Sequence, residues 1–170
     1  MTRFFYVIAT YFLALAIDVS PLFHPSPKLI WNVSASAPVG LYAVQPSGPL
    51  KHGDLVITLP PQPLATFLAE RRYLPRDVPL LKHVAALPGE IVCRYGLVIT
   101  IDGIVVAAAL THDRAGRPLP VWQGCHKLTP NEIFLLNRAV PDSFDGRYFG
   151  PLPMISVIGR AVPLWIVKEQ

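Results

Sequence analysis

Two serines, a proline and a glycine lie close together in the stretch WNVSASAPVGLY, residues 31–42. Pro38 pushes the residue before it toward an extended backbone, and Gly40 permits a turn soon after. Ser34 and Ser36 are therefore expected to point to one side of an extended segment. Two interpretations stay open on this stretch alone. Either both serines make local hydrogen bonds in a loop, or one is a nucleophile that the other assists.

A base for such a nucleophile occurs in the apolar run VPLLKHVAAL, residues 78–87. Most lysines in a strand of this kind point outward or extend to solvent. If Lys82 is instead buried, its ammonium form loses hydration and its pKa falls toward neutrality. A neutral lysine can take the proton of a serine hydroxyl during attack. The residues therefore predict a Ser–Lys pair if Lys82 points inward.

Histidine and metal chemistry are the enzymatic alternatives, and the spacing disfavours both. His83 adjoins Lys82, and adjacent strand residues face opposite sides of a sheet, so His83 should point away if the lysine points in. His and Cys residues do not occur at the spacing of metal ligands. We expect no metal and no cofactor.

The composition favours one mainly β domain. A chain of 170 residues is long enough for one compact core. Its 19 prolines and 11 glycines separate segments rich in Val, Ile and Leu, which is typical of short strands joined by turns. We expect antiparallel sheets in a barrel-like assembly. The formal charge of +4 is spread along the chain without a basic run, so no nucleic-acid partner is expected.

The pattern of apolar residues and turn residues predicts the individual elements. A short amphipathic helix is expected over residues 62–75, ending before a proline. Asp102-Gly103 is expected to form the tight turn of a hairpin over residues 97–110. A surface loop is expected over 111–124, and strands over 53–60, 131–137 and 154–167.

The first 23 residues read as a signal sequence or a membrane anchor. Arg3 precedes an apolar or weakly polar run over 4–17, which is shorter than the roughly 20 residues that span a bilayer core. The tripeptide ALA at 14–16 has the small-x-small form of a cleavage site, so removal and retention both stay open. Arg3 favours a cytoplasmic N-terminus. Residues 24–170 are therefore expected in the periplasm, at the outer face of the bacterial inner membrane.

The expected compartment decides how the two cysteines are interpreted. In an oxidising compartment Cys93 and Cys125 are expected to form one disulfide, which closes a loop of about thirty residues and contributes roughly 3 kcal/mol. Two cysteines alone cannot build a structural zinc site, and the adjoining His126 is poorly placed as a third ligand. Two buried free thiols remain the alternative.

Four segments together resemble the signal peptidase superfamily, family S26. SASAPVGLY resembles its nucleophile box, GDLVI its next strand, LKHVAALPGE its lysine box and SFDGRYFGPLP its final box, in that order over about residues 32–162. The Pro-x-Gly-Leu-Tyr ending, GRPLPVWQGC and the Asp-Gly-Arg-Tyr-Phe-Gly form resemble TraF-type conjugative-transfer peptidases. Housekeeping leader peptidases usually carry Met after the nucleophile, where this chain has Ala37. That departure favours the conjugation branch.

The resemblance assigns roles residue by residue. It makes Ser36 the nucleophile and Lys82 its base. Ser34 would donate its hydroxyl to the oxyanion beside the backbone N–H of Ser36, where one donor can be worth about 10²- to 10³-fold in rate. Ser143 would hold the lysine amine in line. Asp145 would complete the catalytic set by forming with Arg147 a bidentate ion pair that fixes one wall of the site.

The resemblance implies a serine endopeptidase that processes an exported or membrane-tethered protein with small residues before the scissile bond. The expected target is a conjugative pilin precursor, matured by cleavage and, by analogy with TraF-type relatives, by cyclisation. Two alternatives stay open. One is a housekeeping-type signal peptidase I, and the other is a non-catalytic periplasmic component of a conjugation or secretion apparatus.

Overall fold

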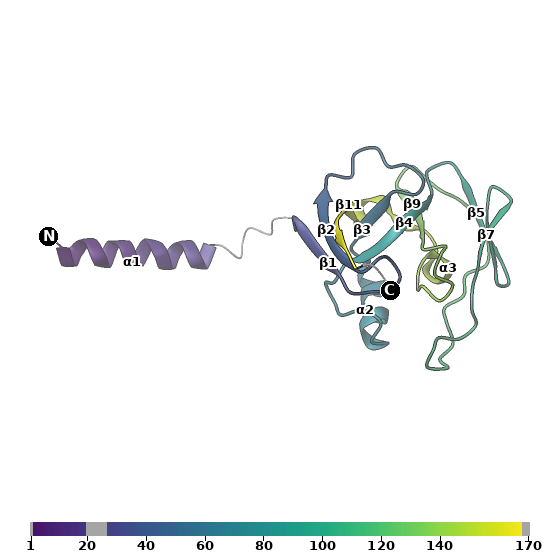
Figure 1. Cartoon of the computed structure of the whole chain (residues 1–170), viewed down its shortest axis with the longest axis horizontal. Coiled ribbons are helices and arrows are strands. Elements are labelled where there is room, and N and C mark those ends of the chain that lie inside the picture. Colours follow the sequence, from purple (N-terminus) through teal and green to yellow (C-terminus); the bar gives the residue numbers. More distant parts are fainter. Residues whose placement is uncertain (1, 20–26, 168–170) are drawn as a thin grey trace.

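The computed structural model describes residues 2–19 and 27–167 of the chain. Helix α1, Thr2–Val19, stands apart from a β-rich body (Figure 1), and its side chains from residue 3 to residue 15 are exposed. Residues 20–23 of the predicted N-terminal segment lie outside the described residues. No helix in the described residues is both long enough and apolar enough to cross a bilayer.

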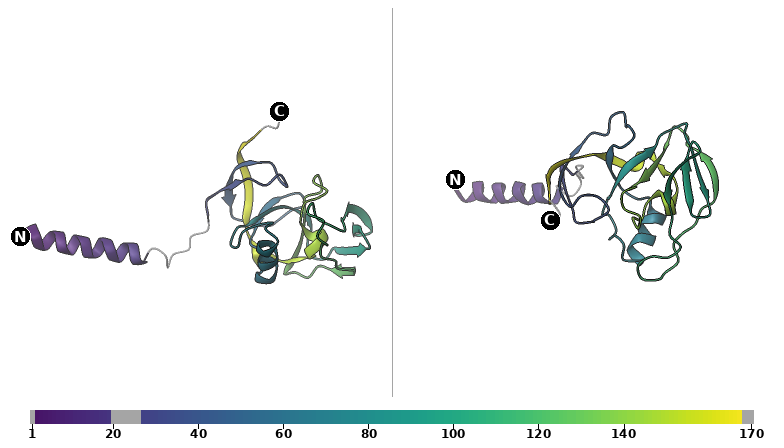
Figure 2. Two further views of the ribbon diagram at one scale, coloured as in Figure 1. Left: turned by 90° about the horizontal axis from the view of Figure 1, so that it is seen from below. Right: turned by 45° about the vertical axis from the view of Figure 1, so that its right-hand side comes forward.

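The larger of two sheets holds seven strands in the order β1-β2-β11-β3-β4-β9-β10, and every pair is antiparallel. Its strands curl around one side of the body (Figures 1 and 2). The bounds are β1 Leu29–Asn32, β2 Gly40–Gln45, β3 Leu55–Thr58, β4 Leu80–Ala86, β9 Glu132–Leu136, β10 Leu152–Pro153 and β11 Val157–Ile166.

The long strand β11 explains why the segment that holds Ser34 and Ser36 is followed by a glycine. Its first half pairs with β3 and its second half with β2, with a register shift in each ladder. At the start of β2 the two backbones approach so closely that a Cβ atom on Gly40 would lie 2.1 Å from the carbonyl oxygen of Trp165. Only glycine fits there. The close approach holds the end of the loop between β1 and β2 against the sheet.

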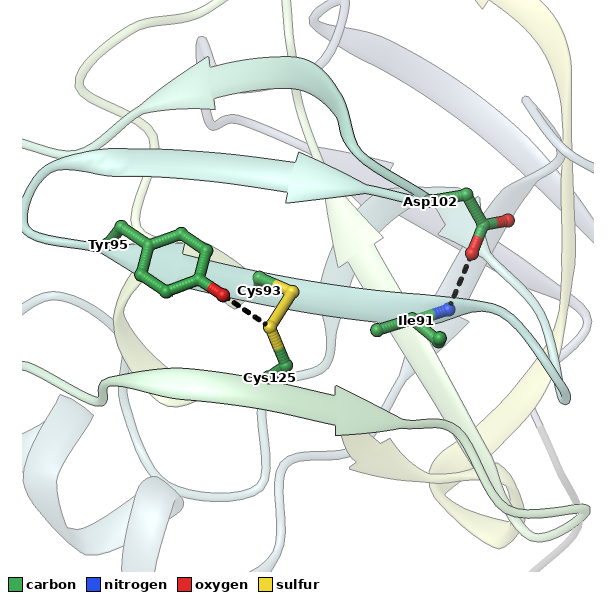
Figure 3. Close-up of a disulfide and its surroundings, with 5 residues drawn as sticks. All are labelled: Ile91, Cys93, Tyr95, Asp102 and Cys125. Carbon is green, nitrogen blue, oxygen red and sulfur yellow. Dashed lines mark hydrogen bonds between the residues drawn. A yellow bond between two sulfur atoms is a disulfide. The ribbon is translucent and has the colours of Figure 1, made fainter.

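The smaller sheet has the order β7-β6-β5-β8 and carries the disulfide. Cys93 on β5 lies directly opposite Cys125 on β8, and the two sulfur atoms are bonded (Figure 3). The hydroxyl of Tyr95 lies 2.9 Å from the Cys125 sulfur. The bounds are β5 Ile91–Tyr95, β6 Val98–Ile101, β7 Ile104–Ala108 and β8 Gly124–Lys127.

Apolar side chains from both sheets fill the space between them. The cluster comprises Ala85, Ala86, Val92, Ile99, Ile101, Leu128, Phe134 and Leu136. Burial of this apolar surface is what holds the small sheet against β4 and β9. The site described below lies on a different part of the larger sheet, where β1, β3 and β4 meet a loop that precedes a short helix, α3, Gly146–Phe149.

The predicted mainly β, antiparallel fold is confirmed, and so is the hairpin between β6 and β7, where Asp102 and Gly103 have φ values of 47° and 81°. The helix predicted over 62–75 is shorter: α2 spans Gln62–Glu70. Arg72 takes a left-handed conformation with φ of 58°, which ends the helix before Pro75 does.

Candidate active site

The two serines lie in the loop that joins β1 to β2. Their hydroxyl oxygens are 2.9 Å apart, and the backbone N–H of Ser36 donates to the Ser34 hydroxyl at 3.3 Å. The segment is not extended, although the sequence predicted it to be. It forms a turn in which the N–H of Ala37 donates to the Ser34 carbonyl, and the turn still places both hydroxyls side by side.

Lys82 points into the body from the middle of β4. Its side chain is only 3% exposed, and its ammonium Nζ donates to the Ser143 hydroxyl at 2.7 Å. Burial lowers the pKa of Lys82 to about 8, an effect that the charge of Asp145 opposes and the charge of Arg147 reinforces. The amine is therefore much easier to deprotonate near neutral pH than an exposed lysine.

His83 lies on the opposite face of β4, as strand alternation predicts. It lines a separate small cavity with His52, while Lys82 lines the cavity of the serines. The backbone N–H of His83 donates to the side-chain oxygen of Asn137, which also lies 3.0 Å from the imidazole Nδ1. A Ser-His-Asp arrangement built on His83 does not fit this geometry.

Asp145 and Arg147 form a buried bidentate pair behind the lysine. Arg147 Nε donates to one carboxylate oxygen at 2.9 Å and Nη2 to the other at 3.0 Å. The same Nη2 also donates to the carbonyls of Asn137 and Val140, at 2.8 and 2.9 Å. Because these carbonyls belong to the loop that leads to Ser143, the pair holds the residue that contacts the lysine amine.

One cavity of about 540 Å³ brings the predicted site residues together. Ser34, Ser36, Lys82 and Ser143 line it, while Asp145 and Arg147 are buried behind its wall. Among the described residues, no hydrogen bond joins Ser36 to Lys82 or Asp145 to Lys82. Apolar side chains line much of the rest of the cavity. Leu68, Tyr73 and Val78 come from α2 and the following loop, and Phe144 comes from the loop before α3.

Two asparagines at this site were missed by sequence reasoning. Asn32, the last residue of β1, bonds to the backbone of the serine loop. Asn137, just after β9, donates to the carbonyl of Leu81 and accepts from the N–H of His83, and so grips β4 on both sides of the lysine. The sequence signal was a polar residue at the end of an apolar strand, which is common in loops and therefore weak.

The described residues contain no group of three His, Cys, Asp or Glu side chains that could hold a metal ion. The cavity presents the hydroxyls of Ser34, Ser36 and Ser143 and the buried amine of Lys82. A hydroxyl beside a second hydroxyl, facing a lysine with a lowered pKa, is an arrangement suited to nucleophilic attack on a carbonyl.

Comparison with known proteins gives the family. The family described as "Signal peptidase, peptidase S26" matches residues 1–166 of this chain. The conjugal transfer protein TraF of Agrobacterium fabrum is 36% identical over 149 residues, which cover 79% of this chain and 80% of that protein. The plasmid transfer protein TraF of Escherichia coli is 33% identical over 147 residues, which cover 79% of this chain and 82% of that protein.

Among solved structures, a signal peptidase I from Enterococcus faecalis aligns with a TM-score of 0.40 and 18% identity, over 67% of this chain and 97% of that one. The family match extends over nearly the whole chain and includes all four segments that carry the serines, the lysine and the ion pair. This chain belongs to the signal peptidase family, peptidase S26.

Proposed function

We propose that this chain is a serine endopeptidase in which Ser36 is the nucleophile and Lys82 the general base. One observation carries the proposal. The buried amine of Lys82 is held by the Ser143 hydroxyl at 2.7 Å and faces the same cavity as the paired hydroxyls of Ser34 and Ser36. A lysine that only served solubility would not be buried, because burial penalises its charged form.

The reaction begins with proton transfer. The neutral amine of Lys82 takes the hydroxyl proton of Ser36 while the oxygen bonds to the scissile carbonyl carbon. The negative charge that develops on the carbonyl oxygen is stabilised by the backbone N–H of Ser36 and the Ser34 hydroxyl. The carbon–nitrogen bond then breaks, and the leaving amine takes the proton from Lys82. An ester on Ser36 remains, which water or another amine resolves.

The substrate is proposed to be an exported or membrane-tethered precursor in conjugative transfer, specifically a pilin precursor. The names of the relatives, conjugal transfer protein and plasmid transfer protein, support the link to conjugative transfer. So does the apolar lining of the cavity, which suits an extended apolar peptide. The peptidase body, residues 24–170, would act in the periplasm at the outer face of the inner membrane, where α1 would address or tether it.

The test is processing of the pilin precursor by variants, followed by mass spectrometry. Ser36→Ala and Lys82→Ala should each lower processing by at least about 10³-fold while the protein stays folded. Ser47→Ala and Lys51→Ala are matched controls, because neither residue lines the cavity, and should process normally. Substantial processing by either site variant, at normal expression, would rule out the Ser–Lys pair.

A second variant separates the enzyme from a non-catalytic component of the transfer apparatus. Lys82→Arg keeps a positive charge and a long side chain, but a guanidinium does not lose its proton and cannot act as a base. A scaffold should tolerate the change, whereas the peptidase should lose activity. A housekeeping-type signal peptidase would instead be recognised by processing of many exported proteins besides the pilin.

A further inference from the structure

Asn32 holds the serine loop together through its side chain. The residue is 9% exposed, and its Nδ2 donates to the carbonyls of Ser34, Ala37 and Pro38 at 2.9, 3.0 and 3.0 Å. Its Oδ1 accepts the backbone N–H of Ser34 at 3.0 Å. An amide nitrogen has two hydrogens, so three carbonyls share them. The loop is therefore folded around one carboxamide group.

This arrangement decides which groups the backbone atoms near Ser36 are bonded to. Three of the loop's carbonyl oxygens converge on Asn32, while the Ser36 N–H is directed to the Ser34 hydroxyl. An oxyanion site needs N–H and O–H donors and excludes carbonyl oxygens, whose lone pairs would repel the developing charge. Because Asn32 binds these carbonyl oxygens, the groups that remain beside the oxyanion position are the two donors, the Ser36 N–H and the Ser34 hydroxyl.

The far end of the loop has a second anchor. Tyr42 on β2 is buried and donates its hydroxyl to the Pro38 carbonyl at 2.6 Å. That bond secures the exit of the loop, but it reaches neither serine. The contacts with the Ser34 backbone come from Asn32 and from the Ala37 N–H.

We propose that Asn32 is a positioning residue of the peptidase reaction, whose carboxamide sets the backbone of the nucleophile loop so that donors alone face the substrate carbonyl. The inference rests on the proposed function, since it names the group that prepares the same site. It predicts an effect on the chemical step, because the loop conformation matters most when charge develops on the carbonyl oxygen.

Asn32→Asp is the sharpest variant. A carboxylate has nearly the same shape and can still accept the Ser34 N–H, but it has no donors and places negative charge against three carbonyl oxygens. The exposed Asn131, in the turn before β9, provides the matched control Asn131→Asp. Asn32→Ser is a second variant that removes the amide without adding charge.

The assay uses the full chain and a quenched fluorescent peptide, selected with the wild-type protein from a library with Ala, Ser or Gly before the scissile bond. Asn32→Asp should lower kcat by about 100-fold or more, with KM within about threefold. The buried carboxylate should also lower the thermal midpoint, and the protein should stay folded at the assay temperature. The pH midpoint of the activity should not move in Asn32→Ser, because that variant adds no charge to the cavity that Lys82 lines. Asn131→Asp should match the wild type, and Asn32→Ser should lie between.

Normal kcat in Asn32→Asp, when Ser36→Ala and Lys82→Ala are inactive, would overturn the inference and leave the proposed function standing. A parallel loss of folding and activity in both Asn32 variants would also overturn it, because Asn32 would then support the fold alone. If Ser36→Ala or Lys82→Ala were active, the proposed function itself would fail.

Discussion

Lys82 links reactivity to stability through one quantity, the pKa of its amine. Burial lowers that pKa from 10.5 to about 8, and the nearby charges of Asp145 and Arg147 act in opposite directions on it. A base is useful only when it is neutral, whereas a buried amine is unfavourable only when it is charged. Both consequences can be measured as functions of pH.

Activity should rise with pH and then level off. Below the pKa of about 8 the neutral fraction of Lys82 increases about tenfold per pH unit, and above it the fraction is nearly complete. The kcat/KM for the fluorescent peptide, measured from pH 5.5 to 9.5, should follow this curve. A flat profile across that range would contradict the assignment of Lys82 as base.

The charged form of Lys82 should destabilise the folded protein at neutral pH. Its folded pKa lies below the unfolded value, so the unfolded state binds more protons between about pH 8 and 10.5, and the free energy of unfolding should rise with pH across that window. Lys82→Met should remove this rise and increase the free energy of unfolding at pH 7 by about 2 kcal/mol. Urea unfolding of both proteins at several pH values tests this. A less stable variant at pH 7 would contradict it.

At the scale of elements, loops and strand ends build the site, while the strands hold them. The β1–β2 loop brings the serines, β4 brings the lysine, and the loop after β9 brings Ser143 under the control of the Asp145–Arg147 pair. The disulfide belongs to the small sheet, and neither of its cysteines lines the cavity. The sheet and the site should therefore respond separately to reduction.

Peptide mapping under non-reducing conditions should find Cys93 linked to Cys125 in protein exported to the periplasm. The Cys93→Ser, Cys125→Ser double variant should lose about 3 kcal/mol of stability, because the unfolded chain regains the freedom of the closed loop. Peptidase activity at a temperature where both proteins are folded should stay near that of the wild type. Two freely alkylated thiols in the exported protein would contradict the bond and weaken the periplasmic assignment.

At the scale of the whole molecule, the edge of the larger sheet beside the serine loop is apolar and exposed. Trp31 on β1 and Trp165 on β11 are 51% and 55% exposed and stack with ring centroids 5.4 Å apart, and both lie opposite Leu41 in the strand register. Exposed tryptophans of this kind suit the interface of a bilayer. If this edge contacts the bilayer, it would orient the body so that the cavity faces a membrane-tethered substrate.

Vesicles of anionic and zwitterionic lipid that carry brominated acyl chains should quench the fluorescence of Trp31 and Trp165. Trp122, which is partly buried and packs against Phe134, serves as the internal reference and should not be quenched. The Trp31→Ser, Trp165→Ser double variant should lose the quenching. Compared with the wild type, it should process the membrane-tethered precursor more slowly, while its processing of a soluble peptide should be less affected. Equal quenching in the double variant would show that the edge does not reach the lipid.

The fate of the ester on Ser36 decides whether the product is a linear chain or a ring. If the substrate's own N-terminal amine lies near the ester, its effective concentration greatly exceeds that of a free peptide, and ring closure competes with water. By family resemblance we expect ring closure. Intact mass should then be one water less than that of the linear cleaved chain, with no N-terminus open to Edman chemistry. The linear mass alone would identify an ordinary peptidase.

Local chemistry in the sequence was sufficient to determine several features of this protein. Alternation along β4 placed Lys82 and His83 on opposite faces, and Asp102-Gly103 specified a hairpin because these residues tolerate positive φ. Proline and glycine spacing indicated a β-rich fold of short antiparallel strands. Each of these features depends on residues that are close together in the sequence, so the sequence alone is enough to predict it.

Tertiary structure alone decided how the site is assembled. The pKa of Lys82 depends on burial by segments far away in sequence, such as Ser143, 61 residues later. The sequence predicts an extended serine segment, but the segment forms a turn. Its carbonyl groups accept hydrogen bonds from the Asn32 amide, and these bonds hold the turn. A lone asparagine at a strand end carries little signal by itself. The role of Asn32 becomes visible only in the folded chain. Its partners are backbone carbonyls, which every residue has, so the residue types in the sequence do not reveal the contacts.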